Sequence, residues 1–206
     1  MKSQAISGFL AEARPWCASA ALAAAAVLVV AAPAAAEEGR IVLETEHFRW
    51  TIGADGRSEA FVDLASGKDL LAPDRTAFAT VTSGGKTTAP ASCALAGGVL
   101  QLGFAEPAAK VAIRAVPRPA YIVFEVVSVE GPATGGPAID EVSFAAVRLA
   151  LPGRSSGISG VVAGETFAAS ARALNLRTAL QLEGGPTPLL RPTAAARPGS
   201  LATASC

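Results

Sequence analysis

The chain has 206 residues, of which 51% are hydrophobic and 17% charged, and its formal net charge is zero. This charge balance implies no basic face, so nucleic acid is not an expected partner. One histidine and three scattered cysteines give no zinc-ligand cluster at the usual spacing, and no acidic loop motif indicates calcium. We therefore expect no metal and no other cofactor.

The first 36 residues have the pattern of a secretory signal peptide. Lys2 and Arg14 precede an apolar run over residues 18–32, and residues 34–36 end the pattern with an A-x-A cleavage site. The run is shorter than the ~20 residues that a helix needs to cross a bilayer. We predict a signal-peptide helix, cleavage after Ala36, export to the periplasm or the extracellular space, and no membrane span in the mature protein. An uncleaved anchor is the alternative.

Strand signals recur at short spacing after this leader, and helix signals are scarce. Phe48, Trp50 and Ile52 alternate with polar residues, and Asp55 and Gly56 then form a typical hairpin turn. The expected strands cover residues 41–46, 47–53, 57–64, 76–82, 86–93, 99–105, 110–116, 121–130 and 139–151. The pattern predicts an all-β domain over residues 37–182, an antiparallel β-sandwich of about ten strands, with a barrel as the alternative.

Three later segments carry more specific expectations. Residues 121–130 are hydrophobic on both faces, which predicts a central strand covered on both sides. The apolar phase of residues 139–151 slips near Ala145 and Ala146, which predicts a β-bulge. Residues 168–182 fit either a short helix or, from residue 173, a strand.

The last segment, residues 183–206, combines four prolines with small residues and has no periodicity. Such a composition predicts a disordered Pro/Ala-rich tail. We interpret it as a linker or as the end of a truncated gene product.

No catalytic residue is predicted. Residues 153–157 match the G-x-S-x-G pattern, but a nucleophile elbow needs a following helix and a later histidine. The single histidine, His47, comes earlier, on the expected polar face of its strand. It is either a general base or an ordinary surface residue.

Three residues are the candidate contacts for a glycan. Trp50 is a possible stacking platform, although its phase with Phe48 also fits the core. Glu125 is a carboxylate on the most apolar strand, where it either has a functional role or pairs with a nearby arginine. Tyr121 opens the same strand and lies on the same face as Glu125.

Two segments carry a family resemblance. The opening hairpin leads into Asp63-Leu-Ala-Ser-Gly-Lys-Asp-Leu70, a D-x-x-S/T-G-x-D-L turn, and residues 121–131 read YIVFEVVSVEG. Together they resemble the N-terminal, galactose-mutarotase-like β-sandwich domain of bacterial secreted glycoside hydrolases, over residues 40–182. The resemblance implies that catalysis belongs to a barrel absent from this chain, so no catalytic residue carries over.

The resemblance thus implies a non-catalytic module of a secreted carbohydrate-active protein, a truncated glycoside hydrolase, whose partner is a carbohydrate or the missing catalytic domain. The main alternative is a free-standing exported module for binding or adhesion at the envelope, without sugar chemistry. A third interpretation, a mutarotase-type epimerase, would have to rely on His47. A module that docks on a barrel is expected to expose a large apolar patch.

Overall fold

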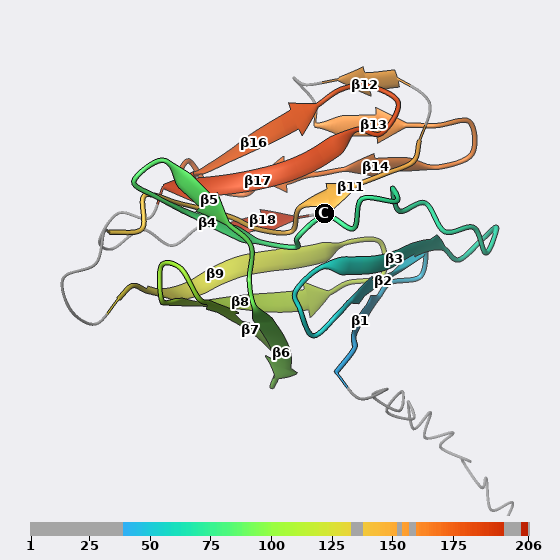
Figure 1. Cartoon of the computed structure of the whole chain (residues 1–206). Coiled ribbons are helices and arrows are strands. Elements are labelled where there is room, and N and C mark those ends of the chain that lie inside the picture. The colour runs from blue at the N-terminus through green and yellow to red at the C-terminus, as the bar shows by residue number, and fades with distance from the viewer. Residues whose placement is uncertain (1–38, 133–137, 152–153, 157–159, 196–202, 206) are drawn as a thin grey trace, which may run out of the picture. The chain divides into compact units, whose positions relative to one another are not determined.

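The computed structural model describes residues 39–132, 138–151, 154–156, 160–195 and 203–205. In these ranges the protein is all-β, with no helix and with several antiparallel sheets consistent with the predicted β-sandwich (Figure 1). The predicted signal peptide lies outside the described residues.

Eighteen strands occur in the described ranges. They are β1 (Ile41–Glu44), β2 (Phe48–Ile52), β3 (Ser58–Asp63), β4 (Thr80–Ser83), β5 (Lys86–Thr88), β6 (Ser92–Ala96), β7 (Val99–Phe104), β8 (Ala109–Pro117), β9 (Ile122–Glu130), β10 (Glu141–Ser143), β11 (Val147–Arg148), β12 (Arg154–Ser156), β13 (Val161–Ala163), β14 (Ala168–Ser170), β15 (Arg172–Ala173), β16 (Thr178–Glu183), β17 (Leu189–Ala195) and β18 (Thr203–Ser205).

The strands form four antiparallel sheets. Two of them have three strands, in the orders β1-β2-β3 and β12-β13-β14. One six-stranded sheet runs β15-β18-β9-β8-β7-β6, and the other runs β11-β17-β10-β4-β5 with β16 paired to β17. The second sheet joins β4, β10 and β17, which are far apart in the sequence, and this gives the fold many non-local contacts.

The β2–β3 hairpin follows its sequence pattern. Phe48, Trp50 and Ile52 are buried and Arg49 is exposed, as the alternation predicts. The chain reverses at Asp55, whose carboxylate accepts a hydrogen bond from the Arg57 N–H at 3.0 Å. The hairpin therefore places one apolar face toward the core.

Trp50 lies at the centre of the core. It is 0% exposed, and its ring centroid is 5.3 Å from that of Phe78 and 5.9 Å from that of Phe124 on β9. Its Nε1 donates a hydrogen bond of 3.1 Å to the Ser58 hydroxyl, which satisfies the one polar atom of the indole. These contacts link the β1–β3 sheet to the sheet that contains β9.

The prediction that β9 is covered on both faces is wrong. Its Ile122, Phe124 and Val126 are buried, but Val123 and Val127 on the other face are only half-buried. Valine is favoured in strands even at partly exposed positions, because its branched side chain suits the pleated surface. Continuous hydrophobicity therefore overstated the cover on this strand.

The predicted bulge is confirmed, at the junction of β10 and β11. Ser143 pairs with Thr193 and Val147 with Leu190, so this side advances by four residues while β17 advances by three. The extra residue is accommodated around Ala145, which has a φ of 50°. The extra residue shifts the alternation of buried side chains by one position, as the sequence indicated.

The predicted disorder of residues 183–206 is wrong for two strands. Leu189–Ala195 forms β17, a largely buried strand between β16 and β10, and Thr203–Ser205 forms β18 beside β9. Pro192 is tolerated because it lies opposite the bulge, where its carbonyl accepts a hydrogen bond from the Phe144 N–H at 3.0 Å. Proline content therefore misled the prediction here.

Candidate functional site

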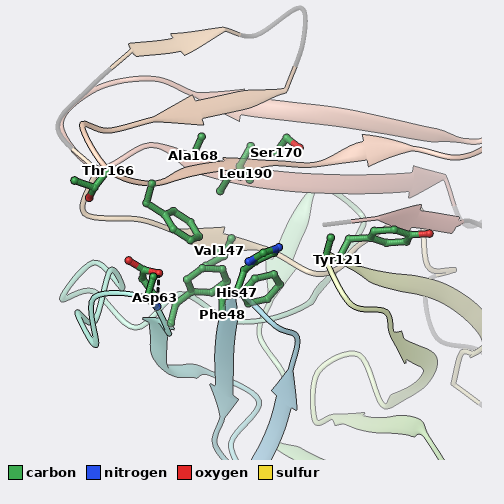
Figure 2. A pocket seen from close by; sticks show the side chains of 14 residues that line it. His47, Phe48, Asp63, Tyr121, Val147, Thr166, Ala168, Ser170 and Leu190 are labelled. Atoms are coloured by element: carbon green, nitrogen blue, oxygen red, sulfur yellow. Dashed lines mark hydrogen bonds between the residues drawn. The ribbon is translucent and has the colours of Figure 1, made fainter.

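A cavity of about 380 Å³ is lined by residues from β2, β3, β11, β14 and β17 and from the loop before β9. Figure 2 shows Asp63, His47 and Tyr121 along one side of it, and Thr166 and Ser170 on the other. The cavity thus combines segments of the chain that lie more than a hundred residues apart.

The floor of the cavity is aromatic and aliphatic. Phe48 and Phe61 stack with their ring centroids 4.8 Å apart and their planes 15° apart, and Phe167 meets Phe61 edge-on at 6.2 Å. Val147 and Leu190, both buried, extend this surface. The two stacked phenylalanines are cross-strand neighbours because both belong to the inward face of the β2–β3 hairpin.

Two polar aromatic side chains lie at the rim. His47 is exposed, and its backbone is fixed because its N–H donates to the Thr45 hydroxyl at 3.1 Å and its carbonyl accepts from the Leu64 N–H at 2.8 Å. Tyr121 is 46% exposed, and its carbonyl accepts a hydrogen bond of 2.8 Å from the Arg118 N–H. Both side chains are therefore presented to solvent from ordered turns.

Asp63 is buried beside the rim, and its carboxylate is occupied by its own turn. One oxygen accepts the Ser66 hydroxyl at 2.5 Å and the other accepts the Ala65 N–H at 3.0 Å. These bonds, that of Ser66 first, outweigh burial and hold the pKa of Asp63 below its ordinary value, with a contribution from His47. The first aspartate of the D-x-x-S-G-x-D-L pattern is therefore a turn-forming residue.

We expect the stability of the protein to depend on the ionisation of Asp63. A carboxyl with a depressed folded-state pKa contributes stability above its unfolded pKa, near 3.8, and that contribution is lost as the pH falls through the lower folded value. Urea denaturation from pH 7 to pH 2.5 should therefore show a steeper acid loss for the wild type than for Asp63→Asn. Parallel curves for the two proteins would show that the turn does not depend on the charge.

The three predicted glycan contacts do not converge. Trp50 is fully buried in the core, so the expectation that it forms a stacking platform is wrong; its phase with Phe48 indicated the core correctly. Glu125 is half-buried on the outer face of β9, where it forms an ion pair with Arg114 of the adjacent strand β8. Tyr121 alone lies in the cavity.

Several lining residues were not singled out from the sequence. The hairpin register pairs Phe48 with Asp63, and this pairing brings the turn next to His47. The sequence contained a signal for this pairing, because Phe48 and Asp63 lie at equal distances along the chain from the predicted turn at Asp55 and Gly56. Phe167 carries no such signal, because it reaches the cavity only through the long-range packing of β14.

Other chemistry has little support in the described parts of the chain. There, no three His, Cys, Asp or Glu side chains gather as metal ligands. The backbone of Arg154–Ser156, inside the G-x-S-x-G pattern, is strand β12, and Gly153 and Gly157 lie outside the described residues. Burial raises the pKa of the Cys93 thiol to about 11, so it is protonated at neutral pH.

No protein-family model matches the chain, and no curated protein matches it. Within the ranges that the structure describes, no helix is both long and apolar enough to cross a membrane. In the described residues, the fold and the cavity together define an all-β protein with a partly enclosed, aromatic-floored site.

Proposed function

We propose that this protein is an exported, non-catalytic β-sandwich module that binds a carbohydrate in the cavity between His47 and Tyr121. The observation that carries the proposal is the combination of the stacked Phe48–Phe61 floor with an imidazole and a phenol at the rim. A sugar ring has an apolar face and a border of hydroxyl groups, so it needs both kinds of surface. The resemblance to glycoside hydrolase modules supports the same class of ligand.

The state of the nearby acidic groups favours binding over hydrolysis. Glycoside hydrolysis generally needs two carboxyl groups that face each other across the substrate. Among the described residues that line the cavity, Asp63 is the one carboxylate, and both of its oxygens already accept hydrogen bonds from its own turn. Glu125 is paired with Arg114 on β8 and does not line the cavity.

A second candidate is an exported binding module whose partner is not a sugar. Leu174 and Leu176, two large apolar side chains, are exposed next to each other on one turn away from the cavity. These two exposed side chains are the observation that favours this candidate.

A glycan array probed with the purified chain tests the proposal. We expect a defined class of glycan to bind, and the double substitution His47→Ala with Tyr121→Ala to weaken binding by about tenfold or more, since each loses a hydrogen-bonding side chain. Glu125→Gln, outside the cavity, should bind as the wild type does. A folded wild type that binds no glycan, or binding that the double substitution leaves unchanged, would contradict the proposal.

A further inference from the structure

The turn between β15 and β16 exposes two leucines. Leu176 is fully exposed and Leu174 is 52% exposed, and both belong to the few large apolar side chains that the described residues leave in contact with solvent. Two such side chains two residues apart form a small apolar tip. We call residues 172–177, which comprise β15 and the turn after it, the leucine turn.

The leucine turn is held in this conformation by the residue between the two leucines. The Asn175 side-chain carbonyl accepts the Arg177 N–H at 2.9 Å and the Thr178 hydroxyl at 3.1 Å. Thr178 is buried and begins β16. Because this Asx turn is anchored to the sheet, the leucines are kept away from the core.

Positive charge flanks the apolar tip. Arg172 and Arg177 are exposed at its two ends. The sequence between Glu165 and Glu183 contains these two arginines and no acidic residue. The leucine turn therefore combines two exposed apolar side chains with two exposed arginines.

We propose that the leucine turn attaches the protein to the surface of an anionic phospholipid bilayer. Leu174 and Leu176 would enter the acyl-chain boundary, and the two arginines would lie at the phosphate headgroups, where their long side chains span from apolar to polar surroundings. The partner is a lipid surface because two exposed leucine side chains offer far less than the ~800 Å² per partner that a stable protein interface buries. A bilayer requires no matching surface shape. This inference does not depend on the glycan proposal.

A local probe tests the insertion directly. The purified chain with Leu176→Trp is mixed with vesicles of phosphatidylglycerol and phosphatidylcholine. Its tryptophan emission is recorded, and the emission of the wild type, which has two tryptophans of its own, is subtracted. We expect a blue shift and quenching by brominated lipids. The matched variant Leu95→Trp, at a leucine that is 42% exposed on β6, should show neither effect. The absence of both effects at position 176 would overturn the proposal, whatever the rest of the chain does.

Vesicle co-sedimentation then separates the two parts of the leucine turn. The double substitution Leu174→Ser with Leu176→Ser should lower the affinity for the vesicles by about tenfold per leucine relative to the wild type. The control Leu95→Ser should bind the vesicles as the wild type does. Arg172→Gln with Arg177→Gln should weaken binding about fivefold per arginine and reduce its salt dependence. If the wild type binds anionic and neutral vesicles equally well, as the arginine variant is expected to do, the anionic preference is overturned. A dimer in solution that the serine variant dissociates would assign the turn to a protein interface instead.

Discussion

Replacing Trp50 by alanine is expected to lower the free energy of unfolding by about 3–5 kcal/mol. The indole is 0% exposed, and the rings of Phe61, Phe78 and Phe124 surround it, so its removal leaves a cavity that these side chains cannot fill. The substitution also leaves the Ser58 hydroxyl, buried at 0% exposure, without its hydrogen-bond donor. Against a total stability of roughly 5–15 kcal/mol, this loss brings the protein close to unfolding.

Urea denaturation followed by far-ultraviolet circular dichroism measures this effect. Trp50→Phe is the matched control, since it keeps an aromatic ring in the cluster and removes the bond to Ser58 together with part of the volume. We expect the control to lose clearly less stability than the alanine variant. A loss below about 1 kcal/mol in Trp50→Ala would mean that this residue is not at the centre of the core.

The alternation of apolar and polar residues along the chain correctly predicted the buried face of β2 and the position of the bulge. Alternation placed Phe48, Trp50 and Ile52 on one buried face because a half-covered strand separates its two faces with a period of two. The same phase favoured the core for Trp50, which was also a candidate sugar platform, and the structure places it in the core. The phase slip near Ala145 located the bulge, since an extra residue exchanges the faces of the strand.

The failures have a common cause in long-range pairing. The sequence analysis missed β17 because this strand pairs with β10 and β16 on its two sides. The sequence of residues 189–195 contains no pattern that predicts these pairings. The proline was taken as a breaker, although the bulge on β10 and β11 leaves a place for it. In the same way, Ile139–Leu151 seemed one strand, and only the structure shows it as two short ones.

The candidate site was predictable only in fragments. His47 and Tyr121 were noted separately, and their separation in the sequence gave no reason to combine them. The aromatic floor and the β14 wall depend on how the sheets pack, which no local pattern encodes. Glu125 was singled out because a carboxylate on an apolar strand is unusual, and the structure explains it by the facing Arg114.

Substituting Gly160 by alanine is expected to cost about 3 kcal/mol or more of stability. Gly160 has a φ of 60°, and an added Cβ would lie 2.5 Å from the Ala171 carbonyl oxygen and 2.2 Å from the Leu180 Cδ2. Leu180 can move, but the Ala171 backbone cannot easily do so, because its N–H donates a 3.0 Å hydrogen bond to the Gly160 carbonyl. Conformational strain and steric conflict therefore act at the same position.

Gly97→Ala separates these two causes. Gly97 has nearly the same φ, 57°, but an added Cβ would meet nothing within 4 Å, so its alanine variant should lose only about 1 kcal/mol, the cost of the left-handed conformation. Chemical denaturation of both variants gives the difference, and equal losses would contradict the steric argument. Because Gly160 precedes β13, which pairs with β14 at the cavity wall, Gly160→Ala should also weaken any ligand binding at Ser170, whereas Gly97→Ala should not. Close backbone packing at this glycine therefore links the stability of the sheet to the shape of the site.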